Sequence, residues 1–240
     1  SPPITVTWHM RADTTTVLTV RTPLVIFTED DATVLPPDDK DGDPFYVDPP
    51  GCPGQTRDSF RSHALLLALP NRLFYDNELR PRADPMLVDC CLRWEGLPNL
   101  SAPILFDGLV GKNEREESSP SWFNNDEAVQ VLAHVKDLLR TRRLPIRPED
   151  IGVITPYNKQ VDRIRKALRA EDEFDLRDIK VGSTELFQGQ ERKVIIISTV
   201  RSSTDHLQLS FDKRHHLGFL DNPKRFNVAL TRACSLLIIV

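Results

Sequence analysis

Two blocks of the sequence carry arginines whose chemistry suits a phosphate group. The first is Phe60-Arg61-Ser62-His63, followed by residues 69–79, and the second runs from residue 225 to residue 233 and contains Arg232. An arginine stays charged at physiological pH, and its planar fork of N–H donors matches the oxygens of a phosphate. Phosphoryl transfer needs cations on the transferring group, often an arginine from a facing lobe. These blocks are therefore candidates for that task.

Two further blocks, residues 151–160 and residues 181–202, carry hydroxyl groups and an aromatic ring. These groups lie after the apolar run 151–154, around residue 183, and near the end of the apolar run 194–200. The residues concerned are Thr155, Pro156, Tyr157, Ser183, Thr184, Thr199 and Arg201. Open α/β sheets bind ligands at the carboxyl ends of their strands. Hydroxyl and guanidinium groups there can bond phosphates, which fixes a nucleic acid in place without reading its sequence.

The phosphate-binding loop of a nucleotide hydrolase is absent from the sequence. No stretch fits Gly-x-x-x-x-Gly-Lys-Ser/Thr, whose backbone amides cradle phosphates and whose hydroxyl holds magnesium. Gly111-Lys112 has the wrong neighbours on both sides. Asp126-Glu127 follows Asn124-Asn125 and not an apolar strand, so we expect it to be the acidic first turn of a helix. This chain alone should hydrolyse little nucleotide.

Apolar strands and amphipathic helices alternate from residue 60 onward, and they must position these groups. We predict strands at 103–106, 151–154, 194–200 and 236–240, and helices at 64–74, after Asn124, at 159–168 and at 227–232. Such an alternation implies a parallel sheet sandwiched by helices. The fold class is therefore α/β, a RecA-like domain over residues 60–240.

Two of these helices should bury a defined apolar face. In the helix after Asn124 we expect Val129, Leu132, Ala133 and Leu139 to face the core. In the helix at 159–168 we expect Val161, Ile164 and Leu168 to do so. The basic residues of that second helix are interpreted as a solvated face.

Residues 1–59 differ in composition from the rest of the chain. They hold nine of the 19 prolines and 4 Lys/Arg against 10 Asp/Glu, whereas residues 60–240 hold 27 against 25. Short strands are predicted at 4–8, 17–20 and 24–27, followed by acidic, proline-rich sequence typical of a loop, linker or partly disordered segment. We assign this segment no function.

Composition excludes some classes of protein. No apolar run approaches the roughly 18 residues that a membrane span needs. The four cysteines show no metal-binding or disulfide spacing, which favours a reducing compartment. His215-His216 lacks a set of partner ligands, so no metal site is expected. The near-neutral charge of residues 60–240 does not by itself indicate a nucleic-acid binder.

The four blocks, in this order and spacing, resemble motifs IV, IVa, V with Va, and VI of the Upf-like RNA helicases of superfamily one. The stretches Ser119–Asn124 and Gly218–Asn227 resemble the Armitage branch of that family, which includes the Moloney-leukaemia-virus-ten helicase. The resemblance covers about residues 60–240. It implies the second RecA-like lobe of a P-loop NTPase, with ATP bound between two lobes.

The resemblance also implies roles around ATP. Arg232 occupies the arginine-finger position, Arg61 the second γ-phosphate contact, and Phe60 the position of an adenine-stacking tyrosine. Gly189 would allow close approach of the backbone, and Glu191 would contact the ribose. The full nucleotide set is Phe60, Arg61, Gln188, Gly189, Glu191 and Arg232, with magnesium held mainly by the first lobe.

Single-stranded RNA is the implied substrate, held by the seven strand-end residues above and by Asn71 of the first block. The implied partners are the N-terminal RecA-like lobe and proteins of a silencing complex, in cytoplasmic RNA granules, with no membrane. Motif VI ends in Ala233-Cys234, where the family usually has a basic residue at the second position.

Alternatives remain for the whole chain and for single residues. The chain can be a non-catalytic RNA-binding or interaction module, or part of a DNA helicase of the same superfamily. Arg232 can form a surface salt bridge, Phe60 can be a core aromatic, Tyr157 can pack at a helix start, and Gln188–Glu191 can be a polar turn.

Overall fold

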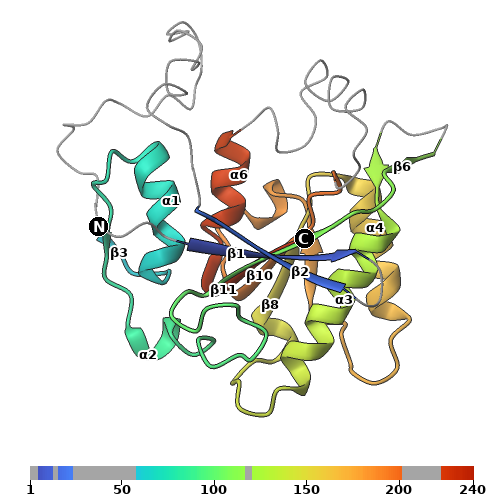
Figure 1. The fold of residues 1–240 in the computed structure, drawn as a ribbon, viewed down its shortest axis with the longest axis horizontal. Coiled ribbons are helices and arrows are strands. Elements are labelled where there is room, and N and C mark those ends of the chain that lie inside the picture. The colour runs from blue at the N-terminus through green and yellow to red at the C-terminus, as the bar shows by residue number, and fades with distance from the viewer. Residues whose placement is uncertain (1–4, 13–15, 24–57, 117–120, 202–222) are drawn as a thin grey trace, which may run out of the picture.

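A seven-stranded sheet forms the centre of the protein (Figure 1). The computed structural model describes residues 5–12, 16–23, 58–116, 121–201 and 223–240. The strand order is β2-β1-β5-β11-β10-β8-β9. The strands are β1 (Thr5–Ala12), β2 (Thr16–Pro23), β5 (Ile104–Leu109), β8 (Ile151–Ile154), β9 (Lys180–Gly182), β10 (Arg192–Ile197) and β11 (Ala233–Ile239). All neighbours run parallel except β1 and β2.

Helices lie on both faces of this sheet, which confirms the predicted α/β class (Figure 1). The α-helices are α1 (Ala64–Phe74), α2 (Pro85–Val88), α3 (Asn125–Arg140), α4 (Asn158–Arg169) and α6 (Pro223–Leu230). Two short 3-10 helices are η2 (Pro148–Asp150) and η3 (Glu185–Phe187). Two small two-stranded sheets pair β3 (Asp58–Ser59) with β4 (Arg80–Pro81) and β6 (Glu114–Arg115) with β7 (Trp122–Phe123).

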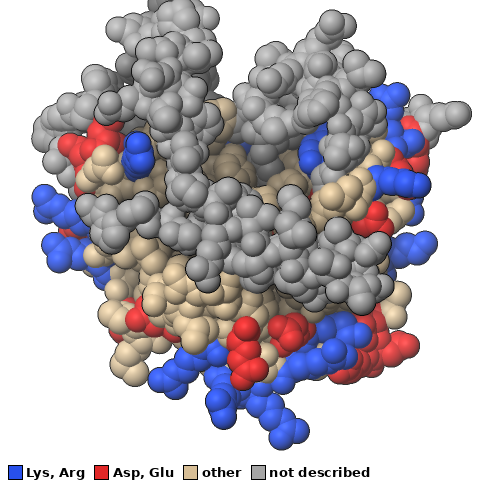
Figure 2. Space-filling view, in the orientation of Figure 1, with Lys and Arg blue, Asp and Glu red and all other residues tan. Residues whose placement is uncertain are grey.

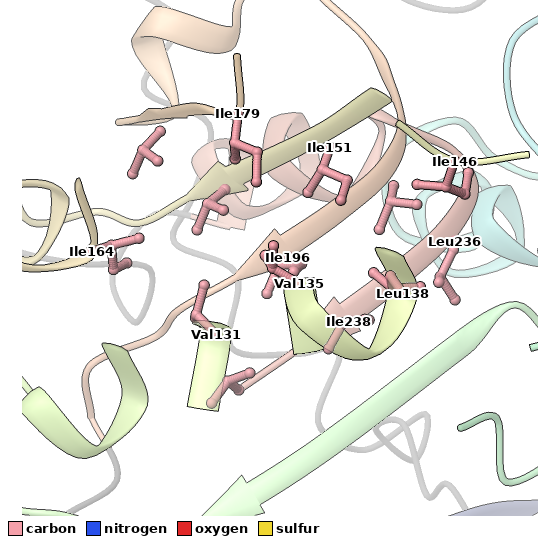
Figure 3. Close-up of a cluster of buried hydrophobic side chains, with 14 of the residues drawn as sticks. Val131, Val135, Leu138, Ile146, Ile151, Ile164, Ile179, Ile196, Leu236 and Ile238 are labelled. Carbon is pink, nitrogen blue, oxygen red and sulfur yellow. The ribbon is translucent and has the colours of Figure 1, made fainter. Parts of the chain in front are cut away.

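Alternate residues of the central strands point to two separate cores, because side chains of a strand alternate between its faces. Val194 and Ile196 of β10 join the larger core beneath α3 and α4, which Figure 3 shows. Ile195 and Ile197 join the smaller core beneath α1, η3 and α6. These strands are buried on both faces, which explains why they read as continuous apolar runs.

The predicted inward face of α3 was wrong for Val129 and Ala133, which are exposed, whereas Leu132 and Leu139 are partly buried and pack against the larger core. Val129 is 65% exposed, and the buried side chains of this helix are Glu127, Ala128, Val131, His134, Val135 and Leu138. The apolar residues alone predicted a different buried face for this helix, because two of the positions that are buried carry the polar side chains of Glu127 and His134. The predicted face of α4 is confirmed, since Val161, Ile164 and Leu168 are buried together with Gln160.

The bounds of several elements differ slightly from the prediction. The helix at 64–74 and the strand at 151–154 occur as predicted. The strand predicted at 194–200 ends at Ile197, and Val200, three residues further on, has a φ of 70° that a strand does not allow. The helix predicted at 227–232 is α6, which begins and ends earlier.

Strands also form near the start of the chain. β1 and β2 lie at two of the predicted places and pair as a hairpin, and β1 runs beside β5. The strand predicted at 24–27 lies outside the described residues. The predicted boundary at residue 60 falls just after β3, which pairs with β4 of the RecA-like part.

Candidate functional site

The predicted nucleotide and RNA residues lie at opposite edges of the sheet. Glu191 directly precedes β10 and Arg232 directly precedes β11, so both lie at the amino ends of parallel strands. Thr155 follows β8, Ser183 follows β9, and Thr199 follows the end of β10 at the carboxyl ends. Because these strands are parallel, the two sets are separated by the length of the sheet.

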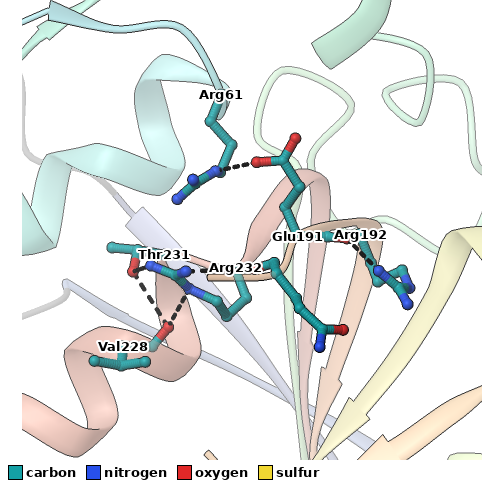
Figure 4. A network of polar contacts seen from close by, with 7 residues as sticks. Arg61, Glu191, Arg192, Val228, Thr231 and Arg232 are labelled. Atoms are coloured by element: carbon teal, nitrogen blue, oxygen red, sulfur yellow. Dashed lines mark hydrogen bonds and ion pairs between the residues drawn. The ribbon is translucent and has the colours of Figure 1, made fainter. Parts of the chain in front are cut away.

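A backbone hydrogen bond docks the Arg61 block onto the amino edge. The backbone N–H of His63 donates to the carbonyl of Cys234 at 2.9 Å. His63 also caps α1, since its Nδ1 accepts from the N–H of Leu65 at 3.1 Å. The loop that carries Arg61 is therefore fixed beside the start of β11, next to Arg232 (Figure 4).

Arg232 is half-buried and bonded to neutral acceptors. Its Nε donates to the carbonyl of Val228 at 3.1 Å, its Nη1 to the carbonyl of Gln190 at 3.3 Å, and its Nη2 to Thr231 Oγ1 at 3.1 Å (Figure 4). Burial, and then the positive charge of Arg61, lower the pKa of Arg232. The alternative of a simple surface salt bridge does not fit these neutral acceptors.

Arg61 forms an ion pair with Glu191 that solvent can reach. Its Nε donates to Glu191 Oε2, and the two side chains are 37% and 54% exposed. Ion pairs this exposed contribute little, with a median of about 0–1 kcal/mol. The pair can therefore open at low cost and release Arg61 to a competing anion.

The remaining nucleotide residues line the same edge. Phe60 is 72% exposed, so it is not the core aromatic that we kept as an alternative. Gln188 and Gly189 are also exposed. Gly189 has a φ of +71°, which suits glycine, and an added Cβ would meet no atom within 4 Å. Glycine here serves the backbone turn and leaves open space beside it.

The loop that reaches this edge is anchored by Phe187 of η3. Phe187 is completely buried, and a Cβ added to Gly152 would lie 2.7 Å from its ring. Glycine at position 152 therefore makes room for the ring to lie against β8. This contact sets where residues 188–191 return to the start of β10.

At the carboxyl edge, the predicted RNA residues differ in accessibility. Thr155, Tyr157 and Thr184 are buried, with exposed fractions of 0%, 3% and 2%. Pro156, Ser183, Thr199 and Arg201 are partly exposed. The hydroxyls of Thr155 and Thr184 have no hydrogen-bond partner within the part of the chain that the structure describes. Tyr157 packs at the start of α4, which is the role that we kept as an alternative to an RNA contact.

Arg201 stacks between two aromatic rings at this edge. Its Cζ lies 4.3 Å from the ring centroid of Trp122 and 5.5 Å from that of Tyr157. Its Nε donates to the Tyr157 hydroxyl at 3.2 Å. Trp122 was missed as a functional candidate, because no local pattern reveals that its ring lies beside Arg201, 79 residues further along the chain. Only the family-like stretch that contains it offered a signal.

Asn71 lies away from both edges and has a local role. Its Nδ2 donates to the carbonyl of Leu79 at 3.0 Å, and its Oδ1 accepts from the Leu79 N–H at 2.8 Å. These bonds close a loop in which Asp76 and Asn77 adopt positive φ values of 50° and 59°. The amide of Asn71 is therefore already engaged in this structure, and its predicted RNA contact stays a prediction.

Charged side chains elsewhere are largely paired. Glu116 binds Lys159 at 2.7 Å and Arg163 at 3.3 Å, which occupies part of the basic helix α4. On the face in Figure 2, basic and acidic side chains are interspersed around the rim. The pairing with Glu116 leaves less of the positive charge of α4 available to a nucleic acid.

Searches for metal ligands and membrane helices gave negative results. Within residues 58–116, 121–201 and 223–240, no three His, Cys, Asp or Glu side chains cluster as metal ligands would. None of the described helices is long and apolar enough to cross a membrane. Cys90, Cys91 and Cys234 are free thiols.

The fold and the two edges describe a nucleotide-binding domain of the P-loop class, and comparison with known proteins agrees. The family described as "AAA domain" matches residues 55–240, and the chain belongs to this family. Its relatives place it in the Mov10/Armitage branch of the Upf1-like superfamily-one helicases. This confirms the resemblance inferred from the motifs.

Three relatives illustrate the similarity. The chain is 50% identical over 190 residues to "Putative helicase mov-10-B.1" of Danio rerio, covering 76% of this chain and 19% of the relative. It is 53% identical over 182 residues to "RNA helicase Mov10l1" of Mus musculus, covering 76% and 15%. It is 37% identical over 190 residues to "Probable RNA helicase armi" of Drosophila melanogaster, covering 75% and 15%. The chain thus spans less than a fifth of the length of these relatives.

Proposed function

We propose that this chain is the second RecA-like lobe of an ATP-dependent RNA helicase. The observation that carries the proposal is the convergence of Arg61 and Arg232 at one edge of the sheet, opposite the edge that holds the RNA candidates. In a two-lobe enzyme these edges would face ATP and RNA respectively. The names of the relatives, which include RNA helicases, support this proposal.

The arginine pair fits the γ-phosphate of ATP. Burial and the nearby charge of Arg61 lower the pKa of Arg232, and an anion bound beside the two guanidinium groups would favour its charged form. Arg232 is held in place by carbonyl groups, so little reorganisation is needed. Phe60 offers an exposed ring face on which adenine can stack. Bound ATP with magnesium supplies the phosphoryl group, and we assign the magnesium ligands mainly to the first lobe.

The carboxyl edge fits a single-stranded RNA backbone. Ser183, Thr199 and Arg201 are partly exposed there, although the Thr199 hydroxyl donates to the carbonyl of Val240 and the Arg201 Nε to the Tyr157 hydroxyl. The buried hydroxyls of Thr155 and Thr184 lie just beneath, without partners among the described residues. A buried hydroxyl without a partner is costly, which favours a bound phosphate or a small rearrangement on binding. Such contacts would position RNA without selecting its sequence.

The resemblance to the Armitage branch is the support for a cellular role. We propose that the complete protein acts in RNA silencing, with silencing-complex proteins as partners, in cytoplasmic RNA granules. Microscopy of the tagged full-length protein, together with a granule marker, tests the location. A uniform nuclear signal would contradict it.

RNA-stimulated ATP hydrolysis tests the biochemical proposal. We expect negligible hydrolysis by the purified chain alone and clear, RNA-stimulated hydrolysis when it is joined to a matching first lobe that carries the phosphate loop. Robust hydrolysis by the chain alone would mean that a further site exists. An inactive two-lobe protein that still binds RNA would favour the non-catalytic RNA-binding module, and preference for DNA would favour a DNA helicase.

A further inference from the structure

The turn after β10 contains a residue in an unfavourable backbone conformation. Val200 has a φ of 70° and is completely buried. A β-branched residue rarely adopts a positive φ, because its side chain collides with the backbone. Such strain persists only where surrounding groups hold it, and it concentrates at functional sites. Val200 lies between Thr199 and Arg201, two of the proposed RNA contacts.

The buried carboxyl group of Glu127 accepts hydrogen bonds from this segment. Glu127, in the first turn of α3, is 0% exposed. Its Oε2 accepts from the backbone N–H of Val200 at 2.8 Å and from Ser198 Oγ at 2.6 Å. A buried backbone N–H left without an acceptor is costly, so this carboxyl oxygen is well suited to hold the strained backbone in place.

Buried polar groups fix the position of Glu127 in turn. Gln160 Nε2 donates to Ser198 Oγ at 3.0 Å and to the carbonyl of Asn124 at 3.0 Å. Gln160 Oε1 accepts from the N–H of Asn124 at 2.9 Å. Asn124 caps α3, so this network joins the starts of α3 and α4 to the end of β10.

We propose that Glu127 is a positioning residue for RNA binding. By bonding Val200 it holds the turn in the conformation that places Thr199 beside Val240 and Arg201 between Trp122 and Tyr157. Glu127 touches no RNA itself. The inference rests on the proposed function, because it assumes that this edge contacts RNA.

Relief of the strain distinguishes this role from simple core packing. Glycine adopts a positive φ at little cost, so Val200→Gly removes the need for a carboxylate to hold the turn. If Glu127 acts through Val200, this second change should rescue Glu127→Ala. If Glu127 serves only the core, Val200→Gly should add a further defect, since it also removes a buried side chain.

RNA affinity of the chain provides the test, with a fluorescein-labelled oligouridine as the probe. We expect Glu127→Ala to weaken binding by roughly tenfold, and Val200→Gly alone to change it by less than about twofold. The double variant should return to within about threefold of the unmodified chain. Ser198→Ala is the matched control, because it removes the other bond to the same carboxylate and should have a smaller effect.

A double variant as weak as Glu127→Ala, or weaker, would overturn the positioning role. An unmodified chain that binds no oligouridine would instead overturn the RNA contacts themselves, and both proposals with them. If Glu127→Ala does not fold, Glu127→Met takes its place, since methionine is close to glutamate in length and removes the carboxyl oxygen that accepts from Val200. Amide hydrogen exchange gives a second readout: exchange at Val200 should accelerate selectively in Glu127→Ala, and unchanged protection would contradict the proposal.

Discussion

Burial, and then the charge of Arg61, lower the pKa of Arg232, although the two arginines come from opposite ends of the matched domain. Their blocks meet because the N–H of His63 bonds the carbonyl of Cys234 at the start of β11. Glu191 partly compensates this positive site through its pair with Arg61. The arrangement is stable without a ligand and has the charge to attract a phosphate.

Replacement of Arg232 should separate ATP turnover from RNA affinity. In a two-lobe protein, we expect Arg232→Ala to lower the turnover number by about 10³-fold or more, because arginine fingers contribute on that scale. RNA affinity should change little, because Arg232 lies at the opposite edge of the sheet. Steady-state ATP hydrolysis and RNA binding measure the two effects. Equal losses of both, or of neither, would refute the arginine-finger assignment.

Replacement of Phe60 should affect nucleotide binding but not folding. Phe60→Ala removes an exposed ring, so the free energy of unfolding should change by less than about 0.5 kcal/mol. In the two-lobe protein the KM for ATP should rise, whereas Phe60→Tyr retains the ring face and should behave like the unmodified protein. Thermal unfolding and ATP titrations give the two quantities. An unaltered KM in Phe60→Ala would remove Phe60 from the nucleotide site.

Loss of the Trp122 ring should weaken RNA binding through Arg201. The Arg201 guanidinium lies 4.3 Å from the Trp122 ring centroid. Cation–π contacts contribute about 0.5–2 kcal/mol, so we expect Trp122→Ala to weaken RNA binding by roughly twofold to thirtyfold. Trp122→Phe keeps a ring face and should lose less. Fluorescence anisotropy measures the affinities, and full RNA affinity in Trp122→Ala would argue against the stacked arrangement.

Acidification should destabilise the protein partly through His63. Burial lowers the pKa of His63 from its usual 6.5, and Asp89 opposes this in part. The unfolded chain therefore binds this proton more readily, so stability is full above pH 6.5 and falls as the pH drops below it. Protonation would also remove the Nδ1 acceptor that caps α1.

The matched variant is His63→Asn, because asparagine caps helices well and does not titrate. Between about pH 7.5 and about pH 5.5, the Tm of the unmodified chain should fall more than that of His63→Asn. Thermal unfolding followed by circular dichroism measures both. Parallel pH profiles would show that His63 contributes nothing to the acid sensitivity.

Much of the fold followed from local sequence patterns. The apolar run 151–154 predicted β8, and Asn124 predicted the start of α3. The spacing of apolar residues mispredicted part of the buried face of α3. The reason is that a sequence does not distinguish a buried glutamate from a solvent-exposed one. Its partners, Ser198 and Val200, are far along the chain and cannot be seen locally.

The sequence by itself determined the α/β class, the family and the separation of the motifs between the two ends of the strands. These follow from short-range periodicity and from blocks of residues in a fixed order. Only the tertiary structure decided which groups meet: Arg61 with Glu191, Arg201 with Trp122, and the Glu127 carboxyl with the backbone N–H of Val200. Each pair joins distant segments, so its geometry depends on how the strands pack and on the strained turn at Val200, which no local pattern encodes.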